Sequence, residues 1–344
     1  MRELAQEVLD GAEAWVVGGA VRDALLGRPL IDLDIACAEP ERAAREYARR
    51  SGGAPFPLSE RHGAWRVALD DGRTVDFTPL PYGIERDLAT RDFTINAIAE
   101  PLAGGELFDP SGGREDIAFR TIRAVSDSVF EDDPLRLLRA VRLEDELGFH
   151  LAPLTEELVR RDAQLVVEPA GERILAELRR LTAAGFRRLD ELGLLAPLGG
   201  GIDQRLDRFD SADYRLVAVF GERLRELPIA NETKRYLRAL LRAAAPDGRS
   251  ARAVHRFRRT TEPWALDALA FVDAADLAPL VEEAREADPA EPLVRGDELG
   301  LPPGPTIGAI LAEIDEERAA GTLRTREEAL ELGRRRAESL RSDG

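Results

Sequence analysis

The sequence predicts an α/β head followed by an all-helical remainder. Three observations support this order. First, strand and helix patterns alternate between residues 14 and 120. Second, helical spacing of Leu, Ala and Arg dominates after about residue 128, and third, Pro- and Gly-rich breaks divide this later part. At 344 residues the chain exceeds one ordinary domain, so we expect two or three packed units. Their expected limits are residues 1–125, 126–200 and 201–344.

Each element of the head follows from a local pattern. Short apolar runs predict strands, a charged amphipathic stretch predicts a helix, and Asp70-Asp71-Gly72 between two alternating runs predicts a hairpin turn. The expected order is strand 14–17, helix 20–26, strand 31–36, helix 39–50, and hairpin strands 64–69 and 73–78. Helical spacing in the remainder is clearest over residues 134–147, 169–183 and 236–245.

Composition limits the class of protein. No apolar run approaches the roughly 20 residues that a membrane span requires. The charged N-terminus lacks the apolar core of a signal peptide. The one cysteine, Cys37, excludes a disulfide framework. We therefore expect a cytoplasmic protein without a membrane partner, and nothing in the sequence implies a protein partner.

The net charge of −17 argues at first sight against a nucleic-acid partner. Its distribution weakens that argument, because residues 231–260 carry nine basic residues against only Glu232 and Asp247. This basic segment can bind phosphates, but a solvated helical face explains the same composition equally well.

The segment from Gly18 to Ile35 carries the clearest chemistry. Side chains alternate along a strand, so Asp32 and Asp34 face the same way. Neighbouring carboxylates repel each other unless a cation lies between them, and Mg²⁺ prefers one or two carboxylates together with substrate phosphates. Gly18 and Gly19 let backbone N–H groups approach an anion at the start of a helix. A phosphate-binding turn beside a metal site indicates nucleotidyl transfer.

Two further residues extend this site. Asp76 alternates with apolar neighbours in the second hairpin strand, which puts it on the same sheet face as the other two carboxylates. Three carboxylates on one face suit a two-metal site. Arg22, just upstream, can reach a triphosphate; its alternative role is a surface ion pair with Asp23.

The segment Thr90–Ala99 is typical of a capped, half-buried helix with its apolar residues in the core. On that interpretation Arg91 and Asn96 are ordinary polar residues.

The segment from Glu131 to Arg142 predicts a helix with an acidic cap and a buried leucine stripe. Asp133 and Arg136 are three residues apart and would form a surface ion pair. The same pair suits a second role. Cytosine and adenine present an amine donor beside a ring-nitrogen acceptor, and uracil and guanine present the reverse, so a carboxylate beside an arginine selects the first two bases. Arg139 and Arg142 continue the spacing at intervals of three, as candidates for binding phosphates.

Taken together, these segments resemble the class II tRNA nucleotidyltransferase and poly(A) polymerase family of bacteria and eukaryotes. The similar stretches follow the family's order and are Gly18–Ile35, Arg91–Ala99, Asp133–Arg142 and a tail segment, Arg295–Leu311. The resemblance implies a polymerase-β-like nucleotidyltransferase head, then a helical neck with a nucleotide-reading helix, and a body and tail that hold the acceptor end of a tRNA.

The resemblance also implies residue roles. Asp32 and Asp34 would bind Mg²⁺, and Asp76 would be a third catalytic carboxylate. The base edge would be read by Asp133 with Arg136. The residues implied in nucleotide binding are Gly18, Gly19, Arg22, Arg91, Asn96, Asp133, Arg136, Arg139 and Arg142.

The chain departs from the family pattern in several places. Thr90 stands where a first arginine is usual, Asp132 replaces a usual glutamate, and Leu143 stands where phenylalanine is common. Only 14 residues separate Asp76 from Arg91. In many CCA-adding members this interval is longer and includes a flexible loop tied to the switch from CTP to ATP, which CC-adding members lack.

The implied activity is template-independent addition of C and A to the 3′ end of tRNA, with CTP and ATP as substrates and pyrophosphate as product. The alternatives are CC-adding or A-adding activity and a poly(A) polymerase. A catalytically silent RNA-binding protein on the same fold and a nucleotidyltransferase for small molecules also stay open.

Overall fold

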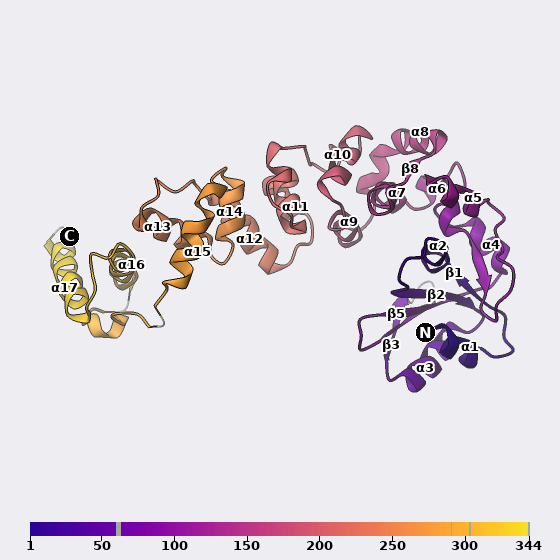
Figure 1. Ribbon diagram of the computed structural model, residues 1–344, viewed down its shortest axis with the longest axis horizontal. Coiled ribbons are helices and arrows are strands. Elements are labelled where there is room, and N and C mark those ends of the chain that lie inside the picture. Colours follow the sequence, from indigo (N-terminus) through magenta and orange to yellow (C-terminus); the bar gives the residue numbers. More distant parts are fainter. Residues whose placement is uncertain (60–62, 290, 303, 343–344) are drawn as a thin grey trace. The chain divides into compact units, whose positions relative to one another are not determined.

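The computed structural model describes residues 1–59, 63–289, 291–302 and 304–342, and the chain divides into two compact units, Met1–Gly199 and Gly200–Gly344 (Figure 1). The expected α/β head and helical remainder are confirmed. The first unit contains both the predicted head and the predicted neck, so the three-part division stays a prediction. No described helix is both long and apolar enough to cross a membrane.

Six strands form the sheet of the head. Their bounds are Ala14–Val17 (β1), Asp32–Cys37 (β2), Ala54–Ser59 (β3), Ala64–Ala68 (β4), Thr74–Pro79 (β5) and Ala99–Pro101 (β6). The strand order is β3-β4-β5-β2-β1-β6; β2 and β5 are parallel, and the other neighbouring pairs are antiparallel. The two predicted strands and the hairpin are confirmed, and the structure adds β3 and β6 at the edges.

The register around β5 decides where charged side chains lie. β2 sets Asp34 beside Asp76 and Asp32 beside Thr74, and β4 sets Arg66 beside Asp76 from the other side. Residues in register, and residues two apart on one strand, share a face of the sheet. Three carboxylates and one arginine therefore lie on a single face.

Helices lie on both sides of this sheet. Figure 1 shows α1 (Arg2–Val8) and α3 (Pro40–Ser51) together on one face and α2 (Gly19–Leu25) toward the other. On the first face Tyr47 of α3 packs against Phe77 of β5, with ring centroids 5.8 Å apart and both side chains buried. The apolar face of the sheet is thus covered, and the charged face is left for α2.

The expectation of a helix over residues 90–99 is wrong. Thr94–Asn96 forms a single 3₁₀ turn (η1), and the chain then enters β6. The physical reason is burial on all sides, because every residue from 92 to 99 is buried and no face is left for solvent. The buried side chains of Thr94 and Asn96 both make hydrogen bonds, as buried polar groups must.

The rest of the first unit is mainly helical. The predicted helix 134–147 is confirmed, but the predicted helix 169–183 is wrong beyond residue 178, because Thr182 caps a new helix by accepting hydrogen bonds from Ala184 N–H and Gly185 N–H. The element bounds are Ile84–Ala89 (α4), Gly113–Ala118 (α5), Thr121–Ile122 (β7), Val129–Asp132 (α6), Leu135–Leu147 (α7), His150–Leu151 (β8), Pro153–Arg161 (α8), Gly171–Leu178 (α9) and Ala183–Glu191 (α10).

Helices are the only regular elements among the described residues of the second unit, and loops join them. Its helices are Ala212–Phe220 (α11), Asn231–Arg242 (α12), Ala251–Thr261 (α13), Ala265–Phe271 (α14), Ala278–Glu286 (α15), Pro305–Ala319 (α16) and Arg326–Ser342 (α17). The helix predicted at 236–245 corresponds to α12, which begins five residues earlier. In the tail segment, Ile310 packs in a small apolar cluster with Val294 and Ala329, while residue 303 lies outside the described residues.

Two prolines mark β3, the outermost strand of the sheet. Pro55 and Pro57 lie two residues apart, and both are in register with β4. Between and beyond them, Phe56 and Leu58 are 42% and 45% exposed. Proline has no N–H to donate to a ladder, which confines it to the edges of sheets.

Candidate active site

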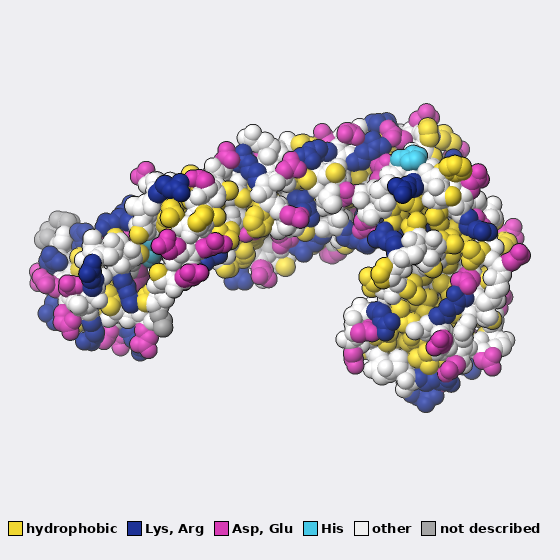
Figure 2. Space-filling view, viewed as in Figure 1, with side chains coloured by type: hydrophobic (Ala, Val, Ile, Leu, Met, Phe, Trp, Pro, Cys, Tyr) yellow, Lys and Arg dark blue, Asp and Glu magenta, His cyan; other side chains and the backbone are white. Residues whose placement is uncertain are grey.

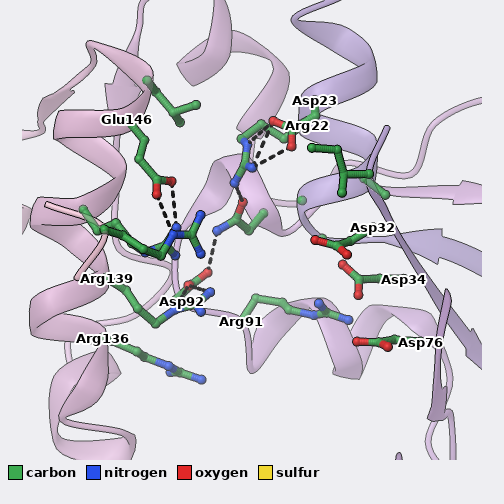
Figure 3. Close-up of a pocket in the computed structure, with 18 of the residues that line it drawn as sticks. Arg22, Asp23, Asp32, Asp34, Asp76, Arg91, Asp92, Arg136, Arg139 and Glu146 are labelled. Carbon is green, nitrogen blue, oxygen red and sulfur yellow. Dashed lines mark hydrogen bonds and ion pairs between the residues drawn. The ribbon is translucent and has the colours of Figure 1, made fainter. Parts of the chain in front are cut away.

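One pocket in the first unit is lined by all twelve predicted site residues. It has a volume of about 570 Å³, and Figure 3 shows carboxylates from the strands on one side and arginines from α7 on the other. Nine arginines and seven acidic side chains line it. This slightly positive balance suits a polyanionic ligand that arrives with a cation.

The three carboxylates of the sheet have different partners. Thr74 donates a hydrogen bond of 2.6 Å to Asp32. Arg66 donates two, of 2.7 and 2.6 Å, to the two oxygens of Asp76. The Asp34 carboxylate has no hydrogen-bond donor among the residues that the structure describes. Asp34 is therefore the carboxylate that lacks a partner.

Asp34 is also short of compensating positive charge. Burial, together with the nearby Asp76 and Asp32, raises the pKa of Asp34 to about 6, and Arg91 offsets only part of this. A half-buried carboxylate without a donor fits a bound cation. Asp32 and Asp34 therefore fit a divalent metal ion held by two carboxylates and completed by substrate phosphates.

The predicted metal ligands are Asp32 and Asp34, with Asp76 as a third catalytic carboxylate, and these roles stay predictions. Among the described residues, no group of three or more Asp, Glu, His or Cys side chains is arranged to hold a metal ion. Asp76 shares the face of Asp32 and Asp34, as predicted, but Arg66 already binds both of its oxygens.

Two glycines keep the space beside Asp34 open. Gly18 has a φ of +68°, and a Cβ atom there would lie 3.0 Å from Nη1 of Arg91 and 3.3 Å from Oδ2 of Asp34. A Cβ on Gly19, the first residue of α2, would lie 3.3 Å from Nη2 of Arg22. A side chain at position 18 would therefore enter the space between Asp34 and Arg91, and one at position 19 would press on the Arg22 guanidinium.

A chain of hydrogen bonds joins Arg22 to Arg139 across the pocket (Figure 3). Arg22 donates to both oxygens of Asp23 at 3.0 Å and to the amide oxygen of Asn96 at 2.7 Å. Asn96 donates to Oδ1 of Asp92 at 2.9 Å, and Arg139 donates two bonds, of 2.9 and 2.6 Å, to Oδ2 of Asp92. Arg22 thus makes the predicted ion pair with Asp23 and still lines the pocket.

Asp92 lies at the centre of this chain, although the sequence interpretation gave it no role. Burial acts to raise its pKa, but Arg139, the Asn96 amide and the Phe93 N–H outweigh burial, so the pKa of Asp92 is lowered. A charged Asp92 therefore connects the segment around η1 to α7.

Asp133 and Arg136 line the pocket, and the Arg136 N–H donates to the Asp133 carbonyl oxygen at 3.0 Å. Among the described residues no ion pair joins their side chains, so the predicted surface ion pair is wrong. Instead, Arg173 of α9 donates to the two oxygens of Asp133 at 2.8 and 3.4 Å. The N-cap residue of α7 is Pro134 rather than the predicted aspartate, but Asp133 accepts a bond of 3.2 Å from Leu135 N–H in the first turn of the helix. The carboxylate is thus held from two sides.

The Arg136 side chain is held by backbone carbonyl oxygens rather than by an acidic side chain. It donates to the carbonyl oxygen of Thr90 at 2.7 Å and to that of Val129 at 3.3 Å. A fixed acceptor at Asp133 and a fixed donor at Arg136 match the base edge of cytosine or adenine.

Arg142 and Arg91 line the pocket with their charges already paired. Arg142 is 6% exposed and donates to Glu177 at 2.5 Å and to Glu146 at 2.8 Å. Arg91 donates from Nε and Nη2 to Asp87, and its Nη1 faces Gly18. Arg142 fixes α7 to α9, and its contact with a nucleotide stays a prediction.

Sequence reasoning missed two charged partners in this pocket. A signal for Arg66 was present, because a hairpin turning at residues 70–72 pairs position 66 with position 76. Arg173 is 40 residues from Asp133, and neither the spacing nor the pattern of the sequence indicates their contact.

The basic segment of the second unit forms two different surfaces. On α13, Arg252, Arg256 and Arg258 make ion pairs with Glu316, Glu317, Glu262 and Asp288. The α12 cations are exposed and have no ion-pair partner in the described parts of the chain; they are Lys234, Arg235, Arg238 and Arg242. Elsewhere, on the face seen in Figure 2, acidic and basic side chains are interspersed.

Known proteins with similar sequences share this architecture. The family model for the poly A polymerase head domain matches residues 14–81 and 71–123. The chain is 33% identical to an A-adding tRNA nucleotidyltransferase of Deinococcus radiodurans, over 94% of this chain and 96% of that protein. It is 48% identical over 174 residues to a CC-adding tRNA nucleotidyltransferase of Geobacter sulfurreducens, a match that covers 50% of this chain and 40% of that relative.

A solved structure extends the similarity to the fold. The crystal structure of the Bacillus stearothermophilus CCA-adding enzyme in complex with CTP is similar to the chain with a TM-score of 0.77 and 28% identity. The match covers 99% of both chains.

Proposed function

The chain belongs to the class II tRNA nucleotidyltransferase and poly(A) polymerase family, and on that basis we propose that it adds C and A nucleotides to the 3′ end of tRNA (CCA addition). CTP and ATP are the proposed nucleotide substrates, and pyrophosphate is the product. The observation that supports this most is the single pocket in which the sheet carboxylates face the arginines of α7. A tRNA-processing role would place the protein in the cytoplasm.

The proposed reaction is a displacement at phosphorus. The 3′-hydroxyl of the RNA loses its proton to solvent and its oxygen bonds to the α-phosphorus. The bond from that phosphorus to the oxygen bridging to the β-phosphate breaks, and pyrophosphate leaves with the electron pair. Asp32 and Asp34 would hold Mg²⁺, which when bound offsets the charge that develops on the phosphate oxygens. Arg22 and Arg91, on either side of the open space at Gly18, would bind the triphosphate and the departing pyrophosphate.

Base selection is assigned to Asp133 and Arg136. Asp133 accepts a hydrogen bond from the exocyclic amine of cytosine or adenine, and Arg136 donates to the neighbouring ring nitrogen. Uracil and guanine present a carbonyl oxygen to Asp133 and an N–H to Arg136, so both contacts become repulsive. No nucleic-acid template is required for this selection.

The proposed RNA contact is the exposed basic face of α12. Its four cations have no acidic partner within the described residues and can pair with phosphates. Arg252, Arg256 and Arg258 of α13 are neutralised by their own ion pairs and are not assigned to RNA.

A second candidate, CC addition, is favoured by one observation. Between Asp76 and Arg91 the chain completes β5 and then forms α4, whose last residue is Ala89, so this interval carries no long loop. The family resemblance associates a short interval at this place with CC-adding members. The Geobacter sulfurreducens relative is a CC-adding tRNA nucleotidyltransferase.

An extension assay at single-nucleotide resolution tests the proposal. Transcripts of tRNA ending before CCA, after C and after CC are incubated with Mg²⁺ and CTP, ATP or both. Stepwise addition of C, C and A supports full CCA addition. A stop after the second C supports the second candidate, and no extension of any transcript contradicts both.

A further inference from the structure

Arg66 and Asp76 form the closest charged pair on the face of the sheet that lines the pocket. They are in register on the neighbouring strands β4 and β5, and Nε and Nη2 of Arg66 bind Oδ1 and Oδ2 of Asp76 at 2.7 and 2.6 Å. Two parallel N–H···O bonds of this kind are the strongest geometry that arginine and a carboxylate form.

The three carboxylates of the sheet differ sharply in what remains available to a metal ion. Asp76 is 7% exposed, and Arg66 covers both of its oxygens. Asp32 is exposed and has one hydroxyl partner, and Asp34 has no donor within the described residues. A metal ion could bind Asp76 only after the fork to Arg66 is broken, which would leave a cation facing the metal.

We propose that Arg66 is a positioning residue that withdraws Asp76 from metal binding, leaving Asp32 and Asp34 as the carboxylates that hold the divalent ion. Arg66 then supplies a fixed positive charge at the place where a two-metal site would need a second ion. This inference deepens the proposed function, because it names the charge arrangement of the same site.

The pair leaves part of the arginine free for a second task. Guanidinium has five N–H donors, and the bonds to Asp76 use two of them. Arg66 lines the pocket with its side chain 33% exposed. Its remaining donors are available to a phosphate oxygen while Asp76 stays bound.

The test measures Mn²⁺ binding without nucleotide or tRNA, by electron paramagnetic resonance of free Mn²⁺ on the full chain. Arg66→Gln frees Asp76 and adds a net negative charge, so Mn²⁺ affinity should rise at least about tenfold. The double variant Arg66→Gln/Asp76→Asn restores the charge balance and should bind Mn²⁺ within about threefold of the original chain. Asp32→Asn, which removes a ligand, should lower Mn²⁺ affinity at least about tenfold.

Two results would overturn the inference. A double variant that loses as much Mn²⁺ affinity as Asp32→Asn would make Asp76 a ligand, and an unchanged affinity in Arg66→Gln would mean that Arg66 does not hold Asp76 away. Arg73→Gln is the matched control, because Arg73 pairs with Asp71 in the turn of the same hairpin and outside the pocket. If thermal unfolding shows that Arg66→Gln does not fold, the Mn²⁺ affinity of the double variant alone decides whether Asp76 is a metal ligand.

The proposed function can fail separately from this inference. Absence of tRNA extension together with the expected Mn²⁺ pattern would contradict the function and leave the metal arrangement standing. If the original chain extends tRNA but the double variant has lost Mn²⁺ affinity, the proposed function is supported and the metal arrangement is contradicted.

Discussion

Arg139 on α7 donates both of its hydrogen bonds to one carboxylate oxygen of Asp92, 47 residues earlier in the chain. The other oxygen of Asp92 accepts from Asn96, whose amide oxygen accepts from Arg22. The part of the pocket proposed to read the base and the part proposed to bind the triphosphate are therefore fixed to the same buried carboxylate.

Replacing Asp92 by Asn keeps the size of the side chain and removes its charge. Arg139 is then left uncompensated, and the free energy of unfolding should fall by about 2 kcal/mol, below the usual cost of breaking a buried pair because the Arg139 side chain is 35% exposed. Urea unfolding measures this. The control is Glu41→Gln on α3, whose side chain is 57% exposed and which we expect to be nearly neutral; equal losses in both variants would contradict the prediction.

Gly18→Ala should destroy nucleotide binding without unfolding the chain. The added methyl group would lie against Arg91 and Asp34, and the backbone at φ +68° and ψ −137°, a conformation that residues with a side chain rarely adopt, would be strained by roughly 1–3 kcal/mol. Gly27→Ala is the matched control, because Gly27 has a φ of +67° and nothing within 4 Å of its Cβ position. Both variants should lose similar thermal stability, and only Gly18→Ala should lose CTP affinity in an equilibrium titration.

Asp34→Asn should stop nucleotide addition and yet stabilise the metal-free chain. The pKa of Asp34 is about 6 in the folded chain, against 3.8 as its ordinary value, so the folded state binds more protons between these two pH values. Stability therefore falls as pH rises from 4 to 6, and the cost at pH 7 approaches about 3 kcal/mol. Asn does not carry this cost.

The check is thermal unfolding in a chelator across pH. The variant should melt above the original chain at pH 7, and the gap should shrink as pH falls and close only below about pH 3, where Asp34 is protonated in both the folded and the unfolded chain. A gap that is constant with pH would show that ionisation of Asp34 is not its cause.

Arg173→Gln should relax the choice of base. Without its bonds from Arg173, Asp133 keeps only the 3.2 Å bond from Leu135 N–H and is free to rotate. The preference for CTP over UTP, measured as a ratio of kcat/KM, should fall by roughly tenfold. Arg160→Gln on α8, outside the pocket and similarly exposed, should leave the ratio unchanged. An unchanged ratio in Arg173→Gln would rule out this role.

The two basic helices of the second unit should differ in tRNA binding. Replacing Arg235 and Arg238 of α12 by Gln removes two unpaired cations, so the slope of log affinity against log salt should fall by about two. Replacing Arg252 and Arg256 of α13 removes cations that Glu316 and Glu317 already neutralise, so a much smaller change is expected. Filter binding over a salt series decides, and equal slopes in the two variants would argue against α12 as the RNA surface.

The sequence predicts the sheet and its carboxylates well because their signals are local. Alternation places Asp32, Asp34 and Asp76 on one face without knowledge of the rest of the fold. The same rule fails for residues 90–99, where helical spacing of apolar residues arises from complete burial of an irregular segment.

Partners of charged side chains are harder to predict. Asp133 and Arg136 are at the spacing of a helical ion pair, but Asp133 precedes α7 and accepts from its first turn, so the helical geometry does not apply to it. Its partner, Arg173, is brought near only by the packing of α7 against α9, which depends on tertiary contacts that no local pattern encodes.

The prolines of β3 bear on how copies of this chain behave at high concentration. An unpaired strand edge with exposed Phe56 and Leu58 would ordinarily attract a strand from another molecule. Because positions 55 and 57 are prolines, two N–H groups are missing from β3, and a strand from another molecule cannot complete a hydrogen-bonded ladder there. Strand-to-strand aggregation is therefore blocked at this exposed edge of the sheet.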